Sequence, residues 1–150
     1  KVLTFHGDLL LEKSLNSGCI ELREAIKRYL VRNRGICVET EQIIIGSGSE
    51  YLYGLIVELL GRERIFAIEK PSYKKIEQVY KATEIKYELL ELTPKGIDSN
   101  ALSKTCADVL HTTPFRSYPS GVTATASKRH EYVNWASKNG RYIIYLLTTL

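Results

Sequence analysis

Cysteine and histidine are scarce in this chain, which leaves little material for a metal site or a disulfide framework. The 150 residues contain three of each: Cys19, Cys37, Cys106, His6, His111 and His130. The cysteines lie too far apart for a paired metal-ligand motif, and their odd number argues against a closed disulfide framework. No two histidines are four residues apart, the spacing that places two ligands on one helix face. We therefore expect no metal site, and a reduced, cytoplasmic protein.

Long hydrophobic runs are also missing. Every apolar run is far shorter than the roughly 20 residues that cross a bilayer, and no basic-then-apolar leader opens the chain. Positive charge is present but dispersed, because the net charge is +4 and the 21 basic residues form no cluster. A basic patch is the usual electrostatic footprint of nucleic-acid binding. The sequence therefore predicts neither membrane contact nor direct nucleic-acid contact for this chain.

Methionine is absent altogether, including at position 1, and the chain stops just after the apolar run from Tyr142 to Leu147. Both features indicate a segment of a longer polypeptide. The length still allows one domain that buries about two thirds of its unfolded surface. A composition with 44% hydrophobic and 25% charged residues is ordinary for a soluble globular protein.

What the chain does contain is a regular alternation of helical and extended segments. Helices are expected at residues 19–33, 50–60, 73–82, 98–104 and 127–139, and strands at residues 42–45, 64–69, 85–92, 108–112 and 141–147. The second helix is expected to bury a stripe of Leu52, Leu55, Ile56, Leu59 and Leu60. Strands that alternate with helices form right-handed crossovers and a largely parallel sheet. The expected fold class is α/β, with helices on both faces of the sheet.

The most informative stretch is the turn between the first expected strand and the second helix. The apolar residues 43–45 end in Gly46-Ser47-Gly48-Ser49, directly before the helix. The free N–H groups of a helix's first turn, together with its dipole, favour a phosphate at this point. Alternatively, a serine here simply caps the helix while the glycines let the chain turn tightly. Neither a Walker loop nor a dinucleotide-binding fingerprint is present.

Two further stretches follow expected strands, and both contain aromatic and turn-forming residues. They are Pro71-Ser72-Tyr73 and the loop from Pro114 to Gly121. Ligands of open α/β sheets collect outside the carboxyl ends of the strands. We therefore expect these two stretches and the serine-glycine turn to line one cleft.

The order of these segments resembles the fold-type-I aminotransferase superfamily, whose cofactor is pyridoxal 5'-phosphate. It is more similar still to the aminotransferase-like domain of MocR-type regulators of the GntR family. The matching stretches are Gly18 to Ile26, Glu41 to Ile45, Ser47 to Ser49, Pro71 to Tyr73, Tyr118 to Thr123 and Arg141 to Ile144. The resemblance implies that residues 1–150 are part of such a domain, without its DNA-binding domain and its C-terminal part.

The resemblance also implies roles for individual residues. The backbone amides of Gly48 and Ser49 correspond to those that hold the cofactor phosphate. Tyr73 looks like the aromatic residue that stacks on the pyridine ring, and Tyr118 falls where aminotransferases have an asparagine that meets the cofactor's phenolic oxygen. For the parent protein the family implies a homodimer, an amino-acid or amine effector or substrate, and DNA contact only through a separate N-terminal domain.

Two departures from the family put catalysis in doubt. Where the family has acidic residues, one of which pairs with the pyridine nitrogen, this chain reads Tyr145-Leu146-Leu147. The Schiff-base lysine of the family lies beyond the end of this chain, and no lysine present matches its motif. The loop Phe115-Arg116-Ser117 also differs from the Ser-His-Gln common in MocR-type domains. We therefore expect a segment that is inactive alone, and assign no catalytic residue.

Three functions remain open at this point. The chain is part of a pyridoxal-phosphate-binding domain of a regulator, part of a class I/II aminotransferase, or a degenerate α/β fragment without a ligand. A helix-turn-helix encoded upstream in the parent gene favours the first of these.

Overall fold

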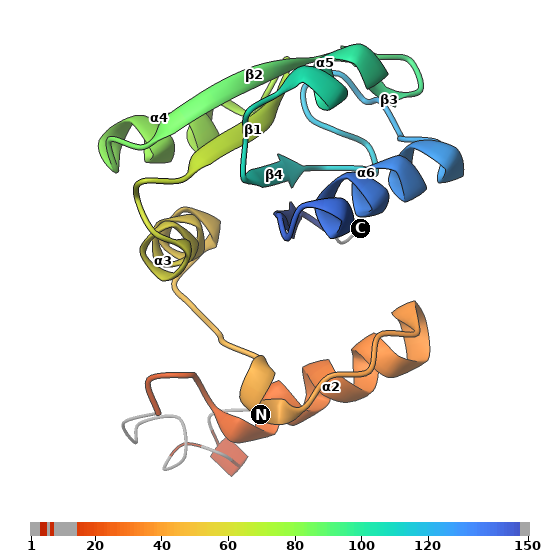
Figure 1. Cartoon of the computed structure of the whole chain (residues 1–150). Coiled ribbons are helices and arrows are strands. Elements are labelled where there is room, and N and C mark those ends of the chain that lie inside the picture. Colours follow the sequence, from red (N-terminus) through yellow and green to blue (C-terminus); the bar gives the residue numbers. More distant parts are fainter. Residues whose placement is uncertain (1–3, 6, 8–14, 148–150) are drawn as a thin grey trace. The chain divides into compact units, whose positions relative to one another are not determined.

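The computed structural model describes residues 4, 5, 7 and 15–147. The chain divides into two compact units, Lys1–Tyr51 and Leu52–Leu150, which are described separately (Figure 1). No helix among the described residues is long and apolar enough to cross a membrane.

The N-terminal unit is built on helix α2, Ile20–Arg34. The helix ends at Gly35, whose backbone adopts a left-handed conformation with a φ of 64° that a residue without a side chain adopts freely. A short 3-10 turn, η1 at Thr40–Gln42, packs against the helix, and the buried Arg23 donates from Nη1 to the carbonyl oxygen of Thr40 at 3.2 Å. The prediction of a helix closed by Gly35 is confirmed.

The predicted strand at residues 42–45 is wrong. Residues 43–45 are in an irregular segment, and Ile44 is 57% exposed. The N–H of Ile45 donates to the carbonyl oxygen of Ser17 at 3.0 Å, but no neighbouring strand is paired with this segment among the described residues. An apolar run becomes a strand only where another strand offers a row of hydrogen-bond partners, and a pattern within the run does not reveal that partner.

The C-terminal unit contains a five-stranded sheet in the order β3-β2-β1-β4-β5. The strands are β1 (Ile65–Lys70), β2 (Lys86–Thr93), β3 (Gly96–Ile97), β4 (Val109–Thr112) and β5 (Tyr142–Tyr145). The helices are α4 (Lys74–Ala82), α5 (Ser99–Lys104), α6 (Ala126–Lys138) and, from Leu52 onward, α3 (Ser49–Leu60). All strand pairs are parallel except β2 with β3. The α/β prediction is confirmed, whereas the short antiparallel β3 was not predicted.

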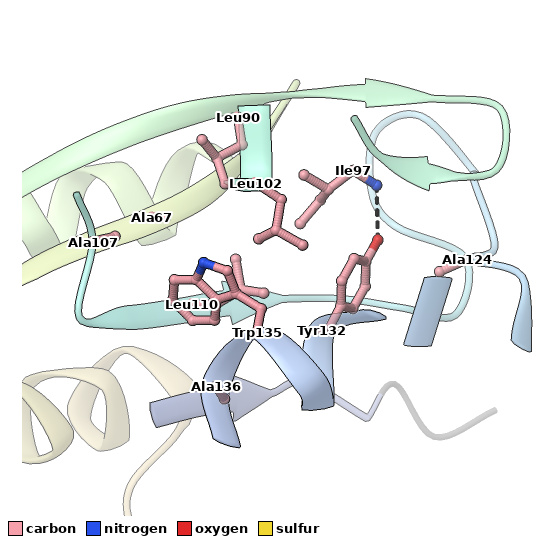
Figure 2. Close-up of a cluster of buried hydrophobic side chains, with 10 residues drawn as sticks. All are labelled: Ala67, Leu90, Ile97, Leu102, Ala107, Leu110, Ala124, Tyr132, Trp135 and Ala136. Atoms are coloured by element: carbon pink, nitrogen blue, oxygen red, sulfur yellow. Dashed lines mark hydrogen bonds between the residues drawn. The ribbon is translucent and has the colours of Figure 1, made fainter. Parts of the chain in front are cut away.

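Alternate residues of the central strands point to opposite faces of the sheet, and each face has its own core. Phe66, Ile68 and Val109 pack with buried side chains of α3 and α4. Ala67 and Leu110 pack on the other face with α5 and α6, as Figure 2 shows. Helices therefore cover both faces, as the near-continuous apolar strands require.

The buried face of α3 differs from the prediction. Tyr53 and Val57, one helical turn apart, are the buried residues, whereas Leu59 is 82% exposed. Leu55 is exposed as well. Because α3 carries apolar residues on more than one side, its pattern alone does not decide which side meets the sheet.

The antiparallel strand β3 is held by the phenol of Tyr132 on α6. The N–H of Ile97 donates to the Tyr132 hydroxyl oxygen at 2.7 Å, the bond drawn in Figure 2. An added Cβ on Gly96, whose φ is 125°, would lie only 2.5 Å from that oxygen. A glycine is therefore required here both for its backbone conformation and for the close approach of the phenol.

A buried histidine lies in the core beneath α3 and α4. His111 of β4 is 2% exposed, and its Nδ1 and the Tyr80 hydroxyl share a hydrogen bond of 2.7 Å. The Tyr53 ring meets the imidazole edge-on, with the ring centroids 4.9 Å apart. Burial lowers the pKa of His111 to about 4, so the imidazole is neutral at physiological pH.

We expect this histidine to make the fold sensitive to acid. Its pKa is lower in the folded state than its ordinary value of 6.5, so the stabilisation is complete above pH 6.5 and is lost as pH falls toward 4. Between these limits the free energy of unfolding of the parent chain should fall on the order of 3 kcal/mol more than that of a His111→Gln variant.

Urea unfolding at several pH values measures this difference. The matched control is His130→Gln, which removes an exposed imidazole outside the core. Equal pH dependence in the parent chain and the His111→Gln variant would contradict the assignment.

Candidate functional site

Two predicted site residues, Tyr73 and Tyr118, meet at the carboxyl edge of the sheet. Tyr73 follows β1 and directly precedes α4, and Tyr118 lies in the β4–α6 loop, residues 113–125. Their ring centroids are 5.7 Å apart and the ring planes are at 84°, an edge-to-face contact. Tyr73 is 38% exposed and Tyr118 is 68% exposed, so aromatic surface of both rings remains open to a ligand.

The buried carboxylate of Glu69, in β1, ties the β4–α6 loop to the sheet. The hydroxyl of Thr112 and the N–H of Thr113 donate to its Oε1 at 2.5 and 3.0 Å. The hydroxyl of Ser117 donates to its Oε2 at 2.5 Å. Glu69 is only 5% exposed, so these three donors supply the contacts that water would otherwise provide.

Burial and hydrogen bonding act in opposite directions on the pKa of Glu69. Burial raises it, and the bonds from Ser117, Thr112 and Thr113 lower it; burial is the larger effect and the pKa lies above its ordinary value. Sequence reasoning missed this residue. The available signal was one acidic residue directly after the apolar run Ile65–Ile68, just before the turn that carries Tyr73.

Ser117 also fixes the shape of the β4–α6 loop. Its N–H donates to the carbonyl oxygen of Val122 at 2.8 Å, and its own carbonyl oxygen accepts from the N–H of Gly121 at 2.6 Å and from the hydroxyl of Ser120 at 3.0 Å. The loop that carries Tyr118 is therefore internally bonded as well as tied to Glu69.

The end of β5 carries an aromatic side chain where the family has its carboxylate. Tyr145 meets Phe115 with ring centroids 6.4 Å apart, and the guanidinium of Arg129 lies 4.9 Å from the centre of the Phe115 ring. Burial raises the pKa of Tyr145, so the phenol is neutral at physiological pH. A neutral phenol does not replace an anionic partner for a pyridinium nitrogen.

The serine-glycine turn belongs to the N-terminal unit and opens α3. The helix begins at Ser49, and the preceding Gly48 has a φ of 104°, with no atom within 4 Å of an added Cβ. The predicted turn into a helix is therefore present, and residues 47–51 are exposed. Both the phosphate-binding and the capping interpretation fit this geometry, so the role of Gly48 and Ser49 stays a prediction.

Parts of pyridoxal phosphate are matched by the chemistry of these groups. The backbone amides and hydroxyls around Gly48 are suitable donors for a phosphate, and the exposed ring of Tyr73 suits a pyridine face. The pyridine nitrogen lacks its acidic partner in the described part of β5 and the residues after it. Taken within its own unit, each group has chemistry that suits one part of the cofactor, and their joint action on one cofactor stays a prediction.

A separate hollow lies between α5 and α6. Residues that line it include His130, Trp135 and Arg141, with the Arg141 guanidinium 4.5 Å from the centre of the Trp135 ring. None of the predicted site residues lines this hollow.

Comparison with solved structures identifies the fold. The chain matches kynurenine aminotransferase of Pyrococcus horikoshii with a TM-score of 0.84 and 25% sequence identity, over 96% of this chain and 37% of that one. The chain shares the α/β fold of the matched part of that aminotransferase. That enzyme was crystallised in complex with PMP. No model of a known protein family matches the chain.

Curated relatives of this chain include bacterial regulators. The uncharacterized HTH-type transcriptional regulator YdeL of Bacillus subtilis is 25% identical over 127 residues, which cover 85% of this chain and 27% of that protein. The HTH-type pyridoxine biosynthesis transcriptional regulator PdxR of Corynebacterium glutamicum is 29% identical over 138 residues, covering 87% of this chain and 29% of that protein. The predicted resemblance to the superfamily and to MocR-type regulators is confirmed. The chain spans less than a third of the length of these two relatives.

A pair of glycine substitutions tests the turn that opens α3. Because Gly48 has a φ of 104°, Gly48→Ala should destabilise the chain by about 1–2 kcal/mol. Gly54 lies within α3 with no atom within 4 Å of an added Cβ, so Gly54→Ala should stabilise it by about 0.5–1 kcal/mol. Urea unfolding followed by circular dichroism measures both, and effects of the same sign would contradict the described turn.

Proposed function

We propose that residues 1–150 are part of the pyridoxal-phosphate-binding, aminotransferase-like domain of a cytoplasmic MocR-type regulator of the GntR family. The observation that carries the proposal is the contact between Tyr73 and Tyr118 at the carboxyl edge of the sheet, 5.7 Å between ring centroids. These residues come from two different strand ends, and the family resemblance implies a cofactor-binding role for each. The similarity to two HTH-type regulators supports the same assignment.

In this proposal the chain's own residues divide the binding between them. The amides of Gly48 and Ser49 hold the phosphate at the start of α3. The ring of Tyr73 stacks on the pyridine, and the Tyr118 hydroxyl donates to the phenolic oxygen. The cofactor, when bound, supplies an electron sink for chemistry at the α-carbon of an amino acid.

The proposed role is binding without catalysis by this chain. No lysine is assigned a covalent role, and the end of β5 carries Tyr145 where the family has an acid. Reversible binding of the cofactor and of an amino-acid or amine effector suits a sensor. The parent protein would act as a homodimer and contact DNA through a separate N-terminal domain.

A second candidate function is a segment of an aminotransferase. The match to kynurenine aminotransferase over 96% of this chain favours it. The two candidates differ in what the parent gene encodes before residue 1. A helix-turn-helix there supports the regulator, and an ordinary aminotransferase N-terminus supports the enzyme.

Titration of the chain with pyridoxal phosphate tests the proposal. We expect saturable binding, weakened about tenfold by Tyr73→Ala because the stacking surface is lost. Tyr142→Ala is the matched control. Tyr142 is similarly exposed, but it is the first residue of β5 and lies at the amino end of the strand, away from the carboxyl ends that carry Tyr73 and Tyr118. Borohydride reduction followed by intact-mass analysis should reveal no specific covalent adduct.

Each alternative result has a defined meaning. A single stoichiometric adduct on one lysine would contradict the proposal that no lysine of this chain has a covalent role. No saturable binding by the parent chain would leave the third interpretation, an α/β fragment without a ligand.

A further inference from the structure

The side chain of Glu69 connects the two strand ends that carry Tyr73 and Tyr118 through hydrogen bonds. Its carboxylate accepts from Thr112 at the end of β4 and from Thr113 and Ser117 in the β4–α6 loop. The residue itself is the penultimate residue of β1. One side chain therefore links β1, β4 and the loop.

Tyr118 and Tyr73 are each close in sequence to a residue of the Glu69–Ser117 hydrogen bond. Tyr118 directly follows Ser117, whose hydroxyl bonds Glu69 and whose backbone bonds Val122 and Gly121. Tyr73 follows Glu69 by four residues, and Pro71 between them restricts the backbone. A shift of Glu69 against Ser117 would therefore change the distance between the two rings.

Stability alone does not explain a carboxylate at this position. A buried carboxyl group costs free energy unless its oxygens are bonded, and an apolar side chain of similar size is often neutral or stabilising in such a place. The three donors instead define one position for the loop, because they come from three residues at fixed geometry. Directional bonds fix the loop relative to β1 in a way that apolar packing does not.

We propose that Glu69 is a positioning residue that holds Tyr118 against Tyr73 in the arrangement that receives the cofactor ring, an inference that rests on the proposed function. The carboxylate itself touches no cofactor atom. It acts through Ser117 and the β4–α6 loop.

A similar carboxylate–hydroxyl bond elsewhere in the sheet provides a matched control. Glu88 of β2 accepts from the hydroxyl of Thr105 at 2.5 Å. Thr105 precedes β4, so this bond lies toward the amino edge of the sheet, away from the two tyrosines. Removing either carboxylate deletes a hydroxyl–carboxylate bond, but only Glu69 is linked to the loop.

The experiment combines pyridoxal phosphate titration with hydrogen exchange of the loop, read by mass spectrometry. Glu69→Ala should weaken pyridoxal phosphate binding about tenfold and speed exchange in residues 113–125. Ser117→Ala removes one donor while leaving the carboxylate bonded to Thr112 and Thr113, so it should weaken binding about threefold. Glu88→Ala should leave both loop exchange and binding as in the parent chain.

Glu69→Gln is the rescue variant. Its amide oxygen can accept from Thr112 and Thr113, and its amide N–H can donate to the Ser117 hydroxyl, so binding should return to within about threefold of the parent. If Glu69 only filled space, Glu69→Leu would restore binding as well, although leucine accepts no hydrogen bond. Rescue by leucine as complete as by glutamine would overturn the inference.

The experiment distinguishes a failure of the proposed role of Glu69 from a failure of the proposed pyridoxal-phosphate binding. A parent chain that takes up no pyridoxal phosphate overturns the proposed function. In that case the hydrogen exchange of residues 113–125 still tests the role of Glu69 in holding the loop: faster exchange in Glu69→Ala than in the parent chain supports it, and unchanged exchange contradicts it. A parent chain that binds while both Glu69→Ala and Ser117→Ala bind equally well overturns the role of Glu69. If Glu69→Ala does not fold, the Ser117→Ala and Glu69→Gln measurements decide.

Discussion

A buried carboxylate joins the two strand ends at which the candidate site is built. Burying Glu69 disfavours its charge, which is why its pKa is raised, yet three donors satisfy both of its oxygens. The parallel register of β1 and β4 places Thr112 beside it, and the loop that follows brings Ser117 to its second oxygen. The position of Tyr118 therefore depends on a polar contact within an otherwise apolar layer.

The sequence pattern was sufficient for most elements of the sheet and insufficient for contacts between them. Alternating apolar runs and helical periods located β1, β2, β4 and β5 to within a residue or two, because each element's burial leaves a local signature. The run at residues 43–45 has the same local signature but forms no strand, since a strand also requires a partner. The buried side of α3 was likewise undecidable from a helix that is apolar on several sides.

The site shows the same division. That Tyr73 and Tyr118 lie at one edge followed from topology, because the carboxyl ends of parallel strands share an edge. The network at Glu69 joins residues 43 to 48 positions apart in the chain, so no local pattern reveals it. Binding and chemistry also have different requirements here. Binding of a phosphate and of an aromatic ring needs only backbone amides and an aromatic side chain. A protonated pyridine nitrogen needs an acidic partner, which β5 does not carry.

The two margins of the sheet are unlike each other. One margin is the two-residue β3, which runs antiparallel and has the Ile97 N–H engaged by the Tyr132 phenol. The other is β5, a parallel strand that pairs with β4 alone among the described residues. A short edge strand whose backbone is already hydrogen-bonded discourages pairing with a further strand, whereas a longer edge strand presents unpaired N–H and C=O groups. A strand from another segment or from another copy of the chain would therefore pair with the edge strand β5 and not with β3.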